Sequence, residues 1–171
     1  DKPFNNTYTV KYLGNVVEGQ KIKYLNLSMD VLKSKVIQQL DNDEVVWFGS
    51  DVGYYGDRES GIWADDRYDY DDIFRLDFSL PKGAMLDYGH SQMNHAMVIT
   101  GYAVKDDKPS KYKIENSWGD KSGKKGYYLA SDSWFDKYVY QAVINKKYLT
   151  EDELKVWEKE PIELKPWDPM G

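Results

Sequence analysis

Apolar and polar positions follow a helical period in one part of the chain and a strand-like pattern in most of the rest. Over residues 29–41 the apolar side chains recur at helical spacing, which predicts an amphipathic helix. Before it, loose alternation between residues 6 and 25, broken by glycine and asparagine, predicts two short strands. The apolar run 44–55 has the residue types of a buried strand. The first part of the chain therefore predicts strands on both sides of a single helix.

The second half of the sequence is dominated by apolar runs that are separated by turn-forming residues. The stretch between the third and fourth runs has a cap residue, either Ser131 or Ser133, and predicts one helical turn. The pattern favours an α+β fold, in which a twisted antiparallel sheet or half-open β-barrel carries helices at its edge. We expect strands at residues 96–104, 112–118, 126–130 and 138–145.

The C-terminal segment has a helix start signal followed by a proline-rich tail. Thr150 and Glu153 have the spacing of a capping box, which predicts a short helix that stops before Pro161. The prolines of the tail favour an extended chain. We therefore expect a β-rich domain over residues 1–149, followed over 150–171 by a short helix and an extended arm.

Composition and charge narrow the classes of function. The 171 residues are 41% hydrophobic and carry a formal net charge of −6, which gives nucleic acid no electrostatic attraction. No apolar run approaches the roughly 18 residues of a membrane span. The chain has no cysteine, which excludes disulfides and favours a reducing compartment, so we expect a cytoplasmic protein.

Two alternative functions have some support in the residues. The chain has 15 Tyr and 6 Trp, and such rings suit a non-catalytic binding module that stacks sugars. His90, His95 and the nearby Asp87 could suggest a metal site, but residues five apart on a strand point to opposite faces. The acidic stretch after residue 57 lacks the spacing of a calcium loop. We therefore expect no metal and no cofactor.

His95 and Asn116 are the polar residues whose positions suggest catalysis. His95 begins one apolar run, and Asn116 lies two residues after Ile114 in the next run. Adjacent antiparallel strands can bring both side chains within reach of each other. We expect the amide oxygen to accept the Nδ1–H of the imidazole and leave Nε2 free for proton transfer. Trp118, two positions further on, can shield the pair from water. Spacing alone does not distinguish this pair from ordinary structural residues.

Two longer motifs carry a family resemblance. "NHAMVITGY" and "YKIENSWGDKSGKKGYYLAS" resemble the histidine and asparagine blocks of papain-like cysteine peptidases. "DYGHSQMNHAMVITGY" and the ending "PWDPMG" resemble the bleomycin hydrolase and aminopeptidase C branch of that family. The resemblance covers at least residues 25–171. It implies the β-rich, histidine-bearing half of the papain-like fold.

The resemblance also implies roles for individual residues. His95 matches the general base that pairs with a cysteine thiolate, and Asn116 matches the residue that orients it. Trp118 matches an indole that covers this contact and lines the leaving-group side. Ala96 matches a position in the pocket for the second residue of the substrate. Gly171, at the end of the tail, matches an arm whose terminal carboxylate meets the free amino group of the substrate, and the family's chains often continue a few residues further.

The nucleophilic cysteine of this family is absent from the sequence. In the family it lies well upstream of the histidine, so we expect this chain to be the C-terminal part of a cysteine aminopeptidase and to be inactive alone. The partners implied are the N-terminal part of the same enzyme, peptide substrates and further copies in a homohexamer. We expect neither nucleic acid nor a membrane as a partner.

Overall fold

A computed structural model of the chain describes residues 2–14 and 16–171, and these residues form two units. One unit is Val36–Ile144, and the other joins the stretch up to Lys35 with Asn145–Gly171. This grouping differs from the expected division after residue 149. The reason is a long-range strand pairing that ties the beginning of the chain to its C-terminal segment.

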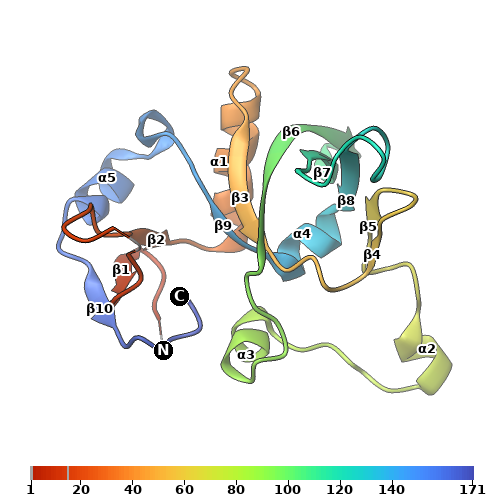
Figure 1. The fold of residues 1–171 in the computed structure, drawn as a ribbon, viewed down its shortest axis with the longest axis horizontal. Helices are drawn as coiled ribbons and strands as arrows, with labels where there is room; N and C mark the ends of the chain where they lie inside the picture. The colour runs from red at the N-terminus through yellow and green to blue at the C-terminus, as the bar shows by residue number, and fades with distance from the viewer. Residues whose placement is uncertain (1, 15) are drawn as a thin grey trace. The chain divides into compact units, whose positions relative to one another are not determined.

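The larger unit contains a curled seven-stranded sheet with the strand order β4-β5-β8-β7-β6-β3-β9 (Figure 1). Every neighbouring pair is antiparallel except β5 and β8, which run parallel. The ladder shifts register at Gly49/Ser50 and twice along β6, and such bulges strengthen the twist of a sheet. The strands are β3 (Val46–Ser50), β4 (Gly56–Asp57), β5 (Ile62–Trp63), β6 (His95–Lys105), β7 (Lys108–Glu115), β8 (Tyr127–Ser131) and β9 (Val139–Ala142).

The four strands predicted in the second half of the chain correspond to β6, β7, β8 and β9, and the α+β class with a half-open sheet is confirmed. One boundary differs from the prediction. β7 ends at Glu115, so Asn116 and Trp118 lie just beyond the strand rather than within it. Beyond the strand the chain turns at Gly119, whose φ of +86° is a conformation that glycine adopts without strain.

Aromatic side chains fill the core between the sheet and helix α4 (Asp132–Tyr138). Ser131 caps this helix by accepting the backbone N–H of Trp134, as its sequence predicts. Phe135 stacks on Tyr112 of β7 with ring centroids 4.3 Å apart, and Trp134 lies 5.5 Å from Trp63. These four rings are at most 1% exposed, so they cannot form a stacking platform for sugars.

Two further helices of the larger unit lie in the long connection between β5 and β6: α2 (Tyr70–Phe74) and α3 (Lys82–Asp87). Figure 1 shows α2 at the end of extended segments, clear of the strands of this unit. None of the residues of α2 is buried. The connection therefore presents side chains to the surroundings instead of adding to the core.

The smaller unit is built on a three-stranded sheet with the order β10-β1-β2. β1 pairs in parallel with β10, so Tyr8 stands opposite Ile162. The predicted capping box is present at the start of α5, where Glu153 accepts the N–H of Thr150 at 2.6 Å and Thr150 Oγ1 accepts that of Glu153 at 3.3 Å. The elements are β1 (Asn6–Val10), β2 (Tyr24–Asn26), the 3₁₀ helix η1 (Lys146–Tyr148), α5 (Glu151–Trp157) and β10 (Ile162–Leu164), with α1 (Met29–Leu40) running from this unit into the larger one.

Candidate active site

His95 is the first residue of β6 and stands opposite Ser50 of β3 in the ladder. Side chains alternate along a strand, so His95 shares a face with Met97 and Ile99, which are at most 2% exposed. His95 itself is half-buried. The sheet thus places the imidazole at the end of the core, where the residue stays partly accessible.

The imidazole is hydrogen-bonded to the side chain of Asn116, as predicted. His95 Nε2 lies 2.8 Å from Asn116 Oδ1. The same oxygen accepts the backbone N–H of Ser117 at 2.8 Å. The N–H of Asn116 donates to the carbonyl of Gly126 at 3.0 Å, which fixes this residue to the start of β8. The orienting residue is therefore held by its backbone as well as by its side chain.

The predicted choice of ring nitrogen is wrong. We expected Nδ1–H to donate to the amide, but the structure places Nε2 against it. A carbonyl oxygen can only accept, so Nε2 must carry the hydrogen, and a neutral imidazole then has its lone pair on Nδ1. Nδ1 has no hydrogen-bond partner among the described residues. The nitrogen available for proton transfer is therefore Nδ1, and the direction of the ring could not be read from strand spacing.

Trp118 covers the His95–Asn116 contact. Its indole stacks on the imidazole with ring centroids 4.9 Å apart and an interplanar angle of 24°. The edges of Trp63 and Tyr128 meet the indole at 6.2 Å and 5.8 Å, and both of these residues are almost fully buried. The buried rings hold the indole in place, so it can exclude water from one side of the hydrogen bond.

A buried carboxylate that the sequence analysis missed holds the segment before His95. Asp51, 2% exposed, follows β3 directly. Its Oδ2 accepts from Ser91 Oγ at 2.7 Å and from the N–H of Gln92 at 3.2 Å. Its Oδ1 accepts from Asn94 Nδ2 at 2.6 Å and from the N–H of Gly53 at 2.9 Å. The carboxylate therefore fixes both the chain that leaves β3 and the chain that enters β6.

Tyr140 extends this network. Its hydroxyl donates to Ser91 Oγ at 2.6 Å, and burial raises its pKa, so the hydroxyl stays protonated at neutral pH. A signal for Asp51 existed in the sequence, because a polar residue that ends one strand faces the start of its antiparallel neighbour. Ser91 and Tyr140 gave no such signal, since their contacts depend on loop geometry.

The remaining predicted site residues have the following positions. Ala96 follows His95 in β6 opposite Gly49, and its side chain is exposed. Gly171 belongs to the smaller unit, where its N–H donates to the carbonyl of Asp168 at 3.0 Å. The structure therefore brings His95, Asn116 and Trp118 together and exposes the residue next to His95.

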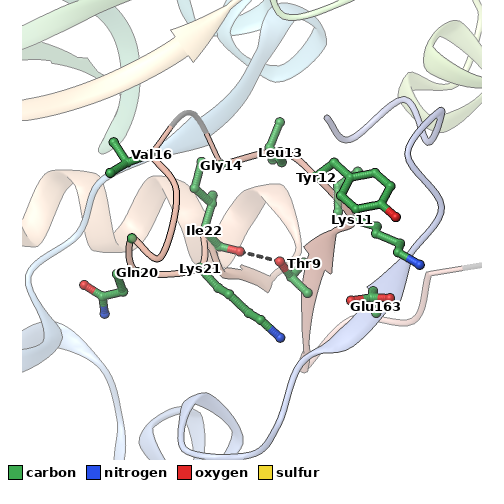
Figure 2. A pocket seen from close by; sticks show the side chains of 12 residues that line it. Thr9, Lys11, Tyr12, Leu13, Gly14, Val16, Gln20, Lys21, Ile22 and Glu163 are labelled. Carbon is green, nitrogen blue, oxygen red and sulfur yellow. Dashed lines mark hydrogen bonds between the residues drawn. The ribbon is translucent and has the colours of Figure 1, made fainter.

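Other features of the described residues that bear on function are few. Within residues 2–14 and 16–171, no group of three or more histidine or acidic side chains could hold a metal ion. Over the same ranges, no helix is long and apolar enough to cross a membrane. A cavity of about 400 Å³ lies in the smaller unit beside the connection between β1 and β2 (Figure 2). Tyr12, Lys21 and Glu163 are among the residues that line it.

The chain is similar to known peptidases over its whole length. The model of the Peptidase C1-like family matches residues 1–171. Aminopeptidase C of Lactobacillus delbrueckii subsp. lactis is 56% identical over 174 residues, which are 100% of this chain and 39% of that protein. Bleomycin hydrolase of Homo sapiens is 41% identical over 172 residues, covering 98% of this chain and 38% of that protein. The chain thus spans well under half the length of these relatives.

A solved structure has the same fold over this region. The crystal structure of PepW from Lactobacillus rhamnosis HN001 superposes with a TM-score of 0.93 at 52% sequence identity. The match covers 99% of this chain and 39% of the PepW chain. The architecture around His95 and Asn116 is therefore shared with a much longer protein.

Proposed function

Because the chain belongs to the Peptidase C1-like family, we propose that it is the C-terminal part of a cysteine aminopeptidase and supplies the general base His95 and the orienting residue Asn116. The observation that carries this proposal is the 2.8 Å hydrogen bond between the two side chains, covered by Trp118. The substrates would be peptides with a free N-terminus, and the nucleophile would be a cysteine of the N-terminal part.

The geometry suggests how each residue acts in the assembled enzyme. Asn116 holds the hydrogen on Nε2, so Nδ1 of His95 can take the proton of the cysteine thiol. The thiolate, which a neighbouring imidazolium stabilises, attacks the scissile carbonyl and forms an acyl-enzyme. His95 gives its proton from Nδ1 to the leaving amine and then activates the water that releases the acid. Ala96 would contact the second residue of the substrate, and Trp118 the leaving part.

A stretch of exposed apolar side chains supports the proposal that the N-terminal part of the protein is the partner. Seven large apolar residues around α2 are each between 39% and 69% exposed. Continuous apolar exposure of this kind is typical of a surface that another protein region covers. These residues, which we name the α2 surface, are Tyr68, Tyr70, Ile73, Phe74, Leu76, Phe78 and Leu80.

Membership of the family also supports proposals about the assembly, the location and the C-terminal arm of the parent enzyme. We propose a homohexameric parent enzyme in the cytoplasm. We also propose that the C-terminal arm, ending at or beyond Gly171, sets the preference for substrates with a free N-terminus. If so, deleting residues 167–171 from the full-length enzyme should allow N-acylated peptides to be cut. Continued rejection of blocked peptides by the deletion variant would contradict a role for the arm.

The test of the proposed function compares the full-length protein with this chain alone. The full-length protein should hydrolyse an unblocked aminoacyl amide reporter, and a thiol-alkylating reagent should abolish the activity. Residues 1–171 alone should be inactive because they contain no cysteine. Substituting His95→Ala in the full-length protein should lower kcat by at least about 100-fold. Activity that survives this substitution or alkylation would rule out the proposed chemistry.

A further inference from the structure

Arg58 lies against the indole that covers the candidate catalytic pair. Its guanidinium carbon is 4.4 Å from the centre of the Trp118 ring, and the imidazole of His95 stacks on the same ring at 4.9 Å. The distance from the guanidinium to the imidazole therefore cannot exceed the sum of these two lengths. A permanent positive charge thus lies one side chain away from the proposed proton donor.

The backbone around Arg58 is held by hydrogen bonds of its turn. The neighbouring Asp57 accepts the N–H groups of Glu59 and Ser60 at 3.0 Å and 3.3 Å, which shapes the turn. The carbonyl of Arg58 accepts the N–H of Gly123 at 2.8 Å. Gly61 packs so closely on Gly123 that an added Cβ would lie 2.9 Å from its Cα. The turn is therefore attached to the loop that follows Trp118.

No carboxylate of the described residues neutralises Arg58. Of the two acidic neighbours in sequence, Asp57 is already paired with Arg67 at 3.0 Å, and its hydrogen bonds with Ser60 and Arg67 lower its pKa. Glu59 and Asp120 carry negative charge nearby, and neither forms an ion pair with Arg58 among the described residues. The loop after Trp118 adds Lys121, Lys124 and Lys125. Arg58 is exposed, so its guanidinium is accessible to a ligand.

We propose that Arg58 is a specificity-determining residue that binds a carboxylate on the leaving part of the peptide, immediately after the scissile bond. This inference rests on the proposed function. The leaving amine must reach a nitrogen of His95 to be protonated, so the residue that carries it lies beside the imidazole and its neighbour Trp118. A carboxylate there meets the guanidinium, which can bind it through two parallel hydrogen bonds. A lysine side chain at the same position meets repulsion.

Three dipeptide-type substrates with the same N-terminal residue distinguish the possible sources of the carboxylate. The first has glutamate amide after the scissile bond, the second has glutamine amide, and the third has glutamine with a free terminal carboxylate. For the full-length enzyme, we expect kcat/KM for one or both anionic substrates to exceed that for glutamine amide by about two- to fivefold, the range of an exposed ion pair. The ratio should fall as salt is added, because exposed charges are screened.

Substitutions separate a binding role from a purely structural one. Arg58→Gln should remove the preference, Arg58→Lys should retain part of it, and Arg58→Glu should reverse it. If Arg58 only supported Trp118, the first of these substitutions would lower kcat/KM for all three substrates equally and leave the ratios unchanged. Lys105→Gln, which removes a positive charge from the exposed end of β6, is the control and should preserve the ratios.

Two kinds of result would contradict a role for Arg58 in selecting the leaving part. Equal kcat/KM for all three substrates in the unsubstituted enzyme, or ratios that persist in the Arg58→Gln variant, would show that Arg58 does not select the leaving part. Failure of the full-length protein to hydrolyse any of the three would overturn the proposed function, and this inference with it. Hydrolysis without charge preference would overturn the role of Arg58 alone.

Discussion

At the scale of single residues, one oxygen atom organises the candidate site. Asn116 Oδ1 accepts from both His95 Nε2 and the N–H of Ser117, each at 2.8 Å. The second donor fixes the direction of the amide, because exchanging its oxygen and nitrogen would place two N–H groups against each other. The amide nitrogen, Nδ2, is buried without a hydrogen-bond partner in residues 2–14 and 16–171. The geometry of the imidazole thus depends on a single acceptor.

Removing this acceptor should impair proton transfer more than substrate binding. In the full-length enzyme, we expect Asn116→Ala to lower kcat by at least about tenfold with a smaller change in KM, because the imidazole loses its preferred tautomer and orientation. Steady-state kinetics on an unblocked aminoacyl amide would measure this. Ser117→Ala is the control, since its backbone N–H remains. An unchanged kcat in the Asn116 variant would contradict the orienting role.

At the scale of elements, buried carboxylates attach loops to the ends of strands and helices. Asp51 joins the end of β3 to the start of β6 through four hydrogen bonds. Asp65 does the same for the chain after β5. It accepts from Ser133 Oγ at 2.5 Å and pairs with Lys137 at 2.6 Å, both residues of α4. Each carboxylate thereby holds an irregular segment, which has no backbone ladder of its own, against a neighbouring strand or helix.

The Asp65 contacts predict a loss of stability in acid. Burial disfavours the charged form of Asp65, but the bonds from Lys137 and Ser133 outweigh it, and its pKa lies below the usual value. A carboxyl group with a lower pKa in the folded state stabilises the fold above its unfolded pKa of about 4, and this contribution disappears as the pH falls through the folded pKa. The free energy of unfolding should therefore decrease in acid.

Urea unfolding at pH 7 and pH 3 would measure this contribution. At pH 7 we expect Asp65→Asn to lower the free energy of unfolding by about 1–3 kcal/mol, because it weakens charge-assisted hydrogen bonds at a site that is 4% exposed. The difference from the unsubstituted chain should shrink at pH 3. Asp66→Asn, which changes an exposed neighbour, should have little effect. A difference that is the same at both pH values would contradict the role of the ionised carboxylate.

At the scale of the whole molecule, the α2 surface distinguishes this chain from a self-contained domain. We expect the isolated chain to associate with itself at rising concentration, because burying exposed apolar side chains against each other lowers the free energy of the system. The substitutions Ile73→Ser and Phe74→Ser, made together, should reduce the mean mass measured by light scattering after size exclusion. Val104→Ser, at a site 55% exposed on the β6–β7 hairpin, is the matched control. A monomer at all concentrations would contradict the prediction.

The parts of this structure that were predictable from sequence depend on local patterns. The period of α1, the Ser131 cap and the capping box at Thr150 are encoded within a few residues. The approach of His95 to Asn116 followed from two adjacent strands joined by a short turn. The ring nitrogen, the contacts of Ser91 and Tyr140 in the Asp51 network and the grouping of the chain into two units depend on loop geometry and on pairing between distant segments. A single sequence carries no local signal for these.

The parallel pairing of Tyr8 with Ile162 has a consequence for how the protein is made. A ribosome releases the chain from its N-terminus, so β1 emerges long before β10, the strand that pairs with it in parallel. The curled sheet of the larger unit lies wholly between these two segments in the sequence, so it can assemble in the meantime. Closing the smaller unit requires ordering a very long loop, and contacts of such high sequence separation form slowly. We therefore expect refolding in two phases, with the β1–β10 ladder acquiring protection from hydrogen exchange last.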